Sequence, residues 1–403
     1  MNRSVTMALF LVVATALTLG IHIYLYRRLI VHTELPQPWR RRGKLLFVLL
    51  GGGLVLSMMG SRVVSVEAAR ILVFPFYIWL GPMFLLVVLL LLSDAGRLLV
   101  KVGRKLSRMK AEPDPDRRRF LARVVAGVTT GTVLSATAYG VNHALGELVV
   151  ERLEVELPKL PRAMDGFCIV QITDLHLGPT RGGEWMAEVV GRVNELRPDL
   201  VAITGDLVDG SVEQLRDDVA HLGKLESGFG SFFVTGNHEY YSGAIEWVAE
   251  LERIGVRVLR NAHVPIVLPT GEGFELAGVD DFRSKGLAEG HGHDVAASVS
   301  GRDETRALVM LAHQPRSIFE AAEHGVDLLL TGHTHGGQIW PVMHLSGLQN
   351  PYVRGLHLHG DTWIYVSSGT GFWGPPMRIL STAEITEVTL RAPSAERVFS
   401  SLD

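Results

Sequence analysis

Cysteine is almost absent from this sequence: Cys168 is the only one among 403 residues. A single cysteine excludes an intrachain disulfide, and it excludes a structural zinc site that would need several thiolates. The sequence also lacks a P-loop, a Gly-x-Ser-x-Gly nucleophile elbow and the glycine fingerprint of dinucleotide binding. The chemistry of this chain must therefore depend on other side chains.

Long apolar runs are concentrated at the front of the chain. The net charge of -3 and the mean hydropathy of +0.23 do not describe a simple soluble protein. Four runs are long enough, or nearly so, to cross a bilayer: residues 5–26, 45–60, 71–92 and 122–145. They predict a membrane domain over residues 1–145 with about four transmembrane helices, and a second domain over residues 146–403. Alternatively, one or two runs are buried core helices, and the short run 45–60 fits this alternative best.

Lysine and arginine are unevenly distributed among the segments that connect these runs. The first and third connections hold dense basic clusters, whereas the second holds only Arg62 and Arg70. Because basic segments stay on the cytoplasmic side, four spans would place both termini outside. We therefore expect a multi-pass protein of the cytoplasmic (inner) membrane with an extracytoplasmic second domain.

The segment Asp116-Arg117-Arg118-Arg119-Phe120-Leu121, just before the fourth run, resembles a twin-arginine export signal. Such signals usually carry Ser or Thr at the position of Asp116. Ala136-Thr137-Ala138 also resembles a small-residue cleavage site. The fourth run is therefore either part of an export signal or a helix that the arginines merely anchor.

Five shorter apolar runs in the second domain each end at a polar segment. They are rich in Val, Ile and Phe and are closed by Gly or a polar residue, which is typical of buried strands. These runs are residues 167–173, 200–204, 231–235, 307–312 and 326–331. Loops at the carboxyl ends of strands are where ligands gather in open α/β sheets.

The polar segments supply the ligand types of a metal site. They are Asp174-Leu175-His176, Gly205-Asp206-Leu207-Val208-Asp209, Gly236-Asn237-His238-Glu239, His313 and Gly332-His333-Thr334-His335. On extended backbone, Asp174 and His176 would project to the same side, as would His333 and His335. A single His or Asp at a strand end is usually a turn or cap residue, but five such segments suit two ions that share a carboxylate. Paired ions of this kind promote displacement at phosphorus.

The order Asp-x-His, Gly-Asp-x-x-Asp, Gly-Asn-His-Glu, His and Gly-His-x-His resembles the calcineurin-like metallophosphoesterase superfamily over roughly residues 171–338. Gly336-Gly337-Gln338 and residues 369–376 are similar to a membrane-associated bacterial branch of exported phosphodiesterases and lipid-linked pyrophosphatases. The resemblance implies an α/β domain built as an αββα sandwich, with two mixed sheets packed face to face and helices outside.

The resemblance also implies the roles of the polar residues. The ligands of one ion would be Asp174, His176, Asp206 and His335, and those of the other Asp206, Asn237, His313 and His333. His238 would be a phosphate contact and candidate general acid that Asp209 orients. The two divalent ions are expected to be manganese, iron or zinc, since imidazole with carboxylate and amide suits all three.

The expected function is that of a dinuclear metal-dependent phosphohydrolase, with a metal-bridging hydroxide as nucleophile and Asn237 among the phosphoryl contacts. The expected partners are the lipid bilayer and a phosphodiester or pyrophosphate substrate, with lipid-linked substrates included; nothing indicates nucleic acid. The apolar stretch Phe372-Trp373 could touch lipid or be a core aromatic pair. The alternative function is a membrane receptor or transporter whose phosphoesterase-like domain only binds.

Helical and alternating patterns predict the remaining elements of the second domain. The polar stretch 285–300 contains His291 and His293, which could bind metal or lie in a solvated loop. The expected helices are residues 182–196, 212–225, 240–254 and 317–324, and the expected further strands are residues 149–156, 257–267, 273–279, 362–368 and 383–390.

Overall fold

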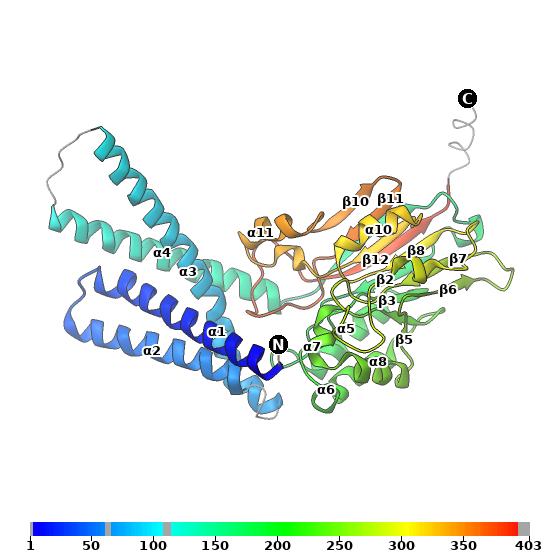
Figure 1. Cartoon of the computed structure of the whole chain (residues 1–403), viewed down its shortest axis with the longest axis horizontal. Helices are drawn as coiled ribbons and strands as arrows, with labels where there is room; N and C mark the ends of the chain where they lie inside the picture. The colour runs from blue at the N-terminus through cyan, green and yellow to red at the C-terminus, as the bar shows by residue number, and fades with distance from the viewer. Residues whose placement is uncertain (1–2, 61–65, 108–113, 394–403) are drawn as a thin grey trace. The chain divides into compact units, whose positions relative to one another are not determined.

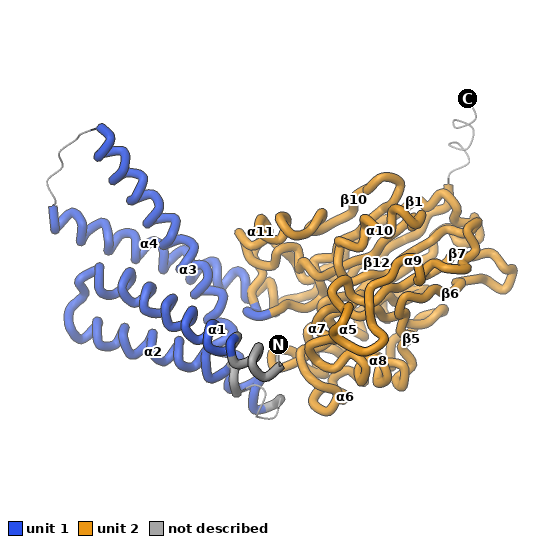
Figure 2. Tube along the Cα trace, in the orientation of Figure 1, with its two compact units in different colours: residues 1–141, 374–376 blue, residues 142–373, 377–403 orange. Residues whose placement is uncertain are grey.

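The computed structural model describes residues 3–60, 66–107 and 114–393. The chain divides into two compact units, which Figure 2 distinguishes by colour. The helical unit comprises residues 1–141 with 374–376. The second unit, called the catalytic unit after the function expected from its sequence, comprises residues 142–373 with 377–403.

Each of the four predicted apolar runs lies in a long helix. The helices are α1 (Arg3–Tyr26), α2 (Gln37–Gly60), α3 (Val66–Leu106) and α4 (Pro115–Leu145). Among the described residues, two helices are long and apolar enough to cross a membrane, over Ala68–Leu106 and Pro115–Leu145.

The basic segments predicted as loops are largely helical, since α3 continues through Lys101 and Lys105 to Leu106. Polar contacts join the ends of these helices. Arg28, just after α1, lies 2.8 Å from the carboxylate of Asp94 on α3. Arg123 on α4 donates to the carbonyl of Thr33, which lies between α1 and α2. The two basic clusters therefore lie at the same end of the helical unit.

The first sheet of the catalytic unit has six strands in the order β1-β12-β2-β3-β4-β5 (Figure 1). Strand β12 runs parallel to β1 and antiparallel to β2, so the sheet is mixed. The strands are β1 (Val149–Glu156), β2 (Cys168–Ile172), β3 (Leu200–Ile203), β4 (Ser231–Phe233), β5 (Arg257–Val258) and β12 (Glu384–Arg391).

The second sheet also has six strands, in the order β10-β11-β9-β8-β7-β6. Its four central strands are parallel, and the two outer ones pair antiparallel. The strands are β6 (Ala262–Val267), β7 (Gly273–Gly278), β8 (Leu308–Leu311), β9 (Leu328–Thr331), β10 (Gly355–His359) and β11 (Thr362–Val366).

The main core lies between the two sheets. Val309 and Leu311 of β8 join a cluster that includes Ile169 and Ala202 of the first sheet. The alternate residues of β8 face the other way and pack with Ile318 of an outer helix. Both faces of β8 are therefore buried, which explains why its sequence is a continuous apolar run rather than an alternating one. The two mixed sheets confirm the predicted α/β architecture.

Short helices flank the sheets. The helix predicted over residues 240–254 is divided in two, because Gly243 adopts a left-handed φ of 100°. Unpredicted helices occur within the polar stretch 285–300 and after residue 341. The helices of the catalytic unit are α5 (Gly183–Glu195), α6 (Val212–Val219), α7 (Asn237–Ser242), α8 (Ala244–Arg253), α9 (Val295–Val299), α10 (Ile318–Glu323) and α11 (Val342–Gln349).

The prediction of a single strand over residues 257–267 is wrong, because the two halves of this segment belong to different sheets. Asn261 interrupts it with a left-handed φ of 48°. The Asn261 side chain accepts from the Asp280 N–H at 3.1 Å and donates to the Gly292 carbonyl. These distant contacts stabilise a crossing from one sheet to the other that local pattern does not reveal.

The intersheet core generates a stability prediction. Phe274 is fully buried, and its ring centroid lies 5.1 Å from that of Phe167. Phe274→Ala should destabilise the catalytic unit by about 3–5 kcal/mol because it removes packing and leaves a cavity. Phe319 on α10 is 50% exposed, and Phe319→Ala should stay within about 0.5 kcal/mol. Thermal unfolding of the full-length chain in detergent measures both, and equal shifts in Tm would contradict the assigned core.

Candidate metal centre

Five strand ends bring the predicted polar segments together. Strands β2, β3 and β4 of the first sheet end just before Asp174, Asp206 and Asn237. Strands β8 and β9 of the second sheet end just before His313 and His333. The five strands predicted from apolar runs are thus confirmed, and each begins and ends within two residues of the predicted bounds.

The backbone of these loops is not extended, contrary to the prediction. Five of the candidate ligands have left-handed φ values between 48° and 72°: Asp174, His176, Asp206, His333 and His335. Non-glycine residues adopt this region only at a cost, and such strain persists where surrounding contacts hold it in place. Here the loops hold one another, since the N–H groups of Asp174 and His176 donate to the carbonyls of Gly205 and Asp206.

Asp206 lies at the centre of the site. Its Oδ2 is 3.1 Å from His313 Nε2, 3.8 Å from His176 Nε2 and 3.9 Å from His238 Nε2. Its Oδ1 accepts the backbone N–H of His238 at 2.8 Å. One oxygen is therefore fixed by the backbone, while the other faces imidazoles on both sides.

Two groups of ligand atoms flank this carboxylate. His335 Nε2 lies 3.3 Å from Asp174 Oδ1 and 3.2 Å from His176 Nε2. On the other side, His333 Nδ1 lies 3.1 Å from His313 Nε2. The structure thus forms one cluster of Asp174, His176 and His335 and a second of Asp206, His313 and His333, with a third grouping of His176, Asp206 and His238 between them.

The second nitrogen of two imidazoles is held by the protein. His176 Nδ1 lies 3.2 Å from Asp209 Oδ2, and His313 Nδ1 lies 2.8 Å from the Thr204 carbonyl. Because a carboxylate and a carbonyl only accept, each Nδ1 carries a proton, so Nε2 is the atom of each ring that can coordinate an ion in the site. This is the usual outer-shell arrangement of metal-binding histidines.

Two buried polar atoms without partners bear on whether the site fits metal ions. Within the described chain, Asn237 Oδ1 and His335 Nδ1 are buried without a hydrogen-bond partner. Leaving a buried polar atom unsatisfied costs on the order of 1–3 kcal/mol. A cation beside Asn237 Oδ1 would satisfy that oxygen, and the oxygen and imidazole donor set suits a divalent transition metal.

The electrostatics of the site favour positive charge. Burial alone would lower the pKa of His313, but the carboxylates of Asp206, Asp174 and Asp281 together outweigh burial and raise the pKa well above its ordinary value. Burial, together with the charge of His313, lowers the pKa of His333 to about 3. The second cluster therefore attracts a cation at Asp206 while His333 stays neutral and able to coordinate.

Asp209 contacts His238 as predicted from the motif. His238 Nδ1 lies 2.5 Å from Asp209 Oδ1. Burial would lower the pKa of His238, but the carboxylates of Asp206 and Asp209 raise it to about 9. His238 is therefore protonated at neutral pH, with Nδ1 bonded to Asp209 and Nε2 facing Asp206.

Glu239 is a positioning residue for which no role is predicted from the sequence, although it belongs to the segment Gly236-Asn237-His238-Glu239. Its buried carboxylate accepts the N–H groups of Asp206 at 3.1 Å, Leu207 at 2.8 Å and Gly236 at 2.6 Å. It thereby joins the loops after β3 and β4 and supports the left-handed turn at Asp206. A Cβ at Gly236 would overlap Asp206 Oδ1, which explains the glycine there.

Arg378 is a second positioning residue, and no sequence signal pointed to it. Its fully buried guanidinium donates to the carbonyls of His335, Ser368, Gly369 and Gly371, among others. Burial lowers its pKa to about 10. Arg378 thereby ties the stretch after β11 to the turn that carries the candidate ligand His335.

The histidines of the 285–300 stretch do not lie in a solvated loop. His291 is buried, and its Nδ1 lies 3.0 Å from the Tyr240 hydroxyl. His293 Nδ1 donates to the Asp280 carbonyl at 3.1 Å. Neither residue belongs to a metal-binding group among the described residues. Their role is to hold the loop against the catalytic unit.

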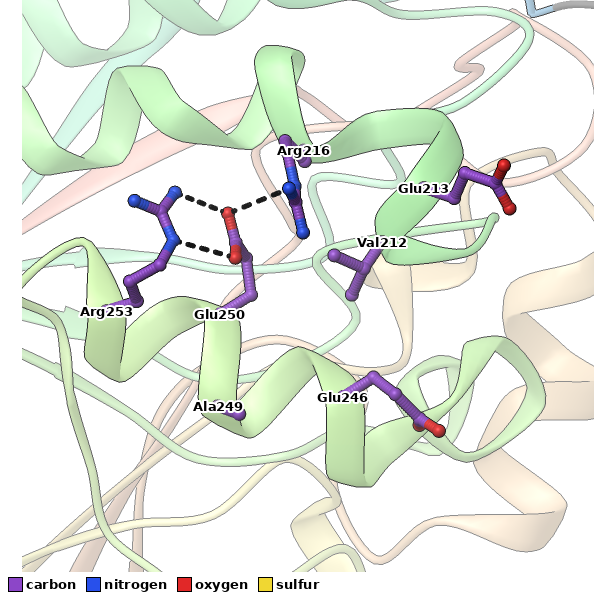
Figure 3. Close-up of a pocket in the computed structure, with 7 residues that line it drawn as sticks. All are labelled: Val212, Glu213, Arg216, Glu246, Ala249, Glu250 and Arg253. Carbon is purple, nitrogen blue, oxygen red and sulfur yellow. Dashed lines mark hydrogen bonds and ion pairs between the residues drawn. The ribbon is translucent and has the colours of Figure 1, made fainter.

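A separate surface pocket lies between α6 and α8 (Figure 3). Glu250 pairs there with Arg253 at 2.6 Å and with Arg216 at 3.7 Å. None of the nine candidate residues lines this pocket. Ion pairs at a surface contribute little to stability, so the pocket is a charged packing feature of the two helices.

Comparisons with known proteins identify the family. The family model "Calcineurin-like phosphoesterase" matches residues 168–337. A Danio rerio "Transmembrane protein with metallophosphoesterase domain" is 37% identical over 298 residues, which are 72% of this chain and 68% of the relative. Its Bos taurus namesake is 41% identical over 286 residues, 68% of this chain and 64% of the relative. An "Uncharacterized metallophosphoesterase" of Helicobacter pylori is 34% identical over 281 residues, 68% of this chain and 73% of the relative.

These alignments span about two thirds of the length of the relatives. The family match over residues 168–337 includes strands β2, β3, β4, β8 and β9 and the polar segments that follow them. The same segments form the clusters of metal-ligating side chains described above. The chain therefore belongs to the calcineurin-like metallophosphoesterases, hydrolases of phosphoric ester bonds.

Proposed function

We propose that this protein is a dinuclear phosphohydrolase that cleaves a phosphodiester or a pyrophosphate at a membrane surface. The observation that carries the proposal is the position of Asp206, whose Oδ2 faces imidazoles of both ligand clusters. A single carboxylate oxygen between two clusters is what a bridge between two ions requires.

The residues divide into two ligand sets around this bridge. Bound divalent ions would supply a nucleophilic water of lowered pKa and electrostatic stabilisation of the phosphoryl oxygens. The proposed ions are manganese, iron or zinc. Asp174, His176 and His335 would hold one ion with Asp206, and Asn237, His313 and His333 would hold the other with Asp206.

His238 is the proposed general acid. Asp209 accepts the Nδ1 proton of His238, so the ring is held with Nε2 toward the site. In hydrolysis, a water molecule loses one proton to solvent and its oxygen forms a new P–O bond; the bond to the leaving oxygen breaks, and Nε2 donates its proton to that oxygen and regains one from solvent. Asp209 also holds His176, so one carboxylate positions the acid relative to a ligand.

A membrane location is the second part of the proposal. Two helices are long and apolar enough to span, and the Danio rerio and Bos taurus relatives are named as transmembrane proteins. We infer four spans, α1 to α4, in the cytoplasmic membrane. The contacts of Arg28 with Asp94 and of Arg123 with Thr33 support one cytoplasmic end for both basic clusters. The catalytic unit would then be extracytoplasmic.

Asp206→Asn should abolish turnover and release metal, because the bridging charge would be lost. The assay is hydrolysis of bis(p-nitrophenyl) phosphate with added manganese, before and after chelation, together with metal analysis of the purified full-length protein. Asp217→Asn serves as the matched control, because Asp217 is an exposed residue of α6. This variant should retain activity and metal. An Asp206→Asn protein that keeps two ions would remove the bridge assignment.

His238→Asn should retain metal and lose rate, since the variant lacks a proton donor. General acid help is worth about 10²–10⁴-fold, and the loss should be smaller for nitrophenyl esters, whose leaving group needs no proton. His176→Asn should instead lose metal. Loss of metal from His238→Asn would make His238 a ligand, as the grouping of His176, Asp206 and His238 also allows.

The orientation predicts that protease added to intact spheroplasts digests the chain from residue 146 onward. Protection of the catalytic unit until lysis would overturn the extracytoplasmic placement. Replacing Arg117 and Arg118 by Lys keeps the charge but spoils a twin-arginine signal. Export that survives this replacement would show that the arginines only anchor α4.

A further inference from the structure

Helix α11 (Val342–Gln349) is an apolar helix on the surface of the catalytic unit. None of its eight residues is buried, and none is a lysine, arginine, aspartate or glutamate. Leu345 and Leu348 are 58% and 83% exposed. Residues three apart lie on the same face of a helix, so the two leucines form one exposed apolar face. A surface helix normally turns a polar face outward.

Other exposed apolar side chains continue this face. We call the set the apolar rim: Trp340, Leu345, Leu348, Trp373 and Leu380, each at least 39% exposed. Backbone contacts connect its members, since Trp340 N–H donates to the Ile379 carbonyl and α11 follows directly after residue 341. Contiguous exposed apolar patches on a soluble surface mark a site of interaction.

The rim extends to the metal centre. Trp373 is 57% exposed, and its ring centroid lies 5.8 Å from that of His238. Gln338 fixes the Trp373 backbone with two hydrogen bonds, accepting its N–H at 3.0 Å and donating to its carbonyl at 2.9 Å. Phe372, the adjacent aromatic residue, is buried under the Arg181 guanidinium. Of the two aromatics, only Trp373 is available to a ligand.

We propose that the apolar rim binds the lipid bilayer and presents membrane-embedded phosphoesters to the metal centre. The part of this inference that concerns substrate rests on the proposed function. A substrate with a lipid tail could leave its tail in the bilayer along the rim while its phosphorus reaches the site beside His238. The expected substrate class is therefore a phosphoester whose leaving or retained group carries a lipid.

Three observations favour lipid as the occupant of the rim. Two described helices are long and apolar enough to span a membrane. Only residues 146–148 separate α4 from β1, and three extended residues reach about 10 Å, so the catalytic unit begins near any membrane that α4 crosses. The rim combines exposed tryptophan and leucine with Arg354, which donates to the Leu380 carbonyl, and this combination is typical of surfaces that lie in the membrane interface.

The chain allows a site-specific test because Cys168 is its only cysteine. In the full-length Cys168→Ser protein, Leu348→Cys would be labelled with a polarity-sensitive fluorophore and reconstituted into phosphatidylcholine–phosphatidylglycerol nanodiscs. Phe319→Cys is the matched control, because the Phe319 side chain on α10 is half-exposed. Phosphatidylcholine carrying a nitroxide near the headgroup should quench the Leu348→Cys label several-fold more strongly than the control label.

Equal quenching at the two positions would overturn the proposal, whatever the emission colour. Blue-shifted emission at Leu348→Cys without lipid quenching would mean that protein covers the rim, either the chain's own helices or a second copy. Red-shifted emission without quenching would mean that water covers it. Because the fluorescence readout needs no enzymatic activity, it tests whether the apolar rim contacts lipid even if the proposed function is wrong.

A second measurement tests the substrate class. The double variant Leu345→Gln, Leu348→Gln should hydrolyse a phosphodiester lipid in nanodiscs about tenfold more slowly, because two apolar anchors are lost. Its hydrolysis of soluble bis(p-nitrophenyl) phosphate should stay within about twofold of the unaltered chain. Equal losses on both substrates would refute the presentation role. Failure of the unaltered chain on both substrates would refute the proposed function instead.

Discussion

The buried carboxylate of Asp206 is the constraint on which the site depends. A charge removed from water must be compensated by hydrogen bonds or by opposite charge. The backbone of His238 satisfies one oxygen, and the other faces the imidazoles of two clusters. Asp174 is buried in the same site, and its pKa is raised by burial and by the charge of Asp206, despite the opposing effect of His313. Two cations would remove both costs at once.

The fold satisfies this constraint because strands of both sheets end at the same edge of the domain. The first sheet supplies Asp174, Asp206 and Asn237, and the second supplies His313 and His333. The two clusters keep their relative positions only if the two sheets do. The core packed between the inner faces of the sheets holds the sheets together. Glu239 then sets the loop geometry within the first sheet, and Arg378 ties the His335 turn to the stretch after β11.

Local pattern was enough to predict the strands and the polar segments at their ends. Each of these strands is buried on both faces, so its sequence is a continuous apolar run, as in β8. Pattern failed where distant contacts decide the backbone. Gly243 divides a predicted helix in two, and Asn261 divides a predicted strand between two sheets. Helix α11 carries no periodic signal because no face of it is buried. The metal and catalytic roles of the nine residues stay predictions.

The sequence by itself determined the family, the strand ends and the identity of the side chains delivered to them, because these features are encoded in short contiguous segments. Only the tertiary structure decided how those side chains converge. Extended backbone had been expected to align Asp174 with His176, but left-handed turns held by hydrogen bonds between neighbouring loops do so instead. It also decided that Phe372 is buried while Trp373 is exposed beside His238. Such choices depend on contacts between residues far apart in the chain, whose energies no local pattern contains.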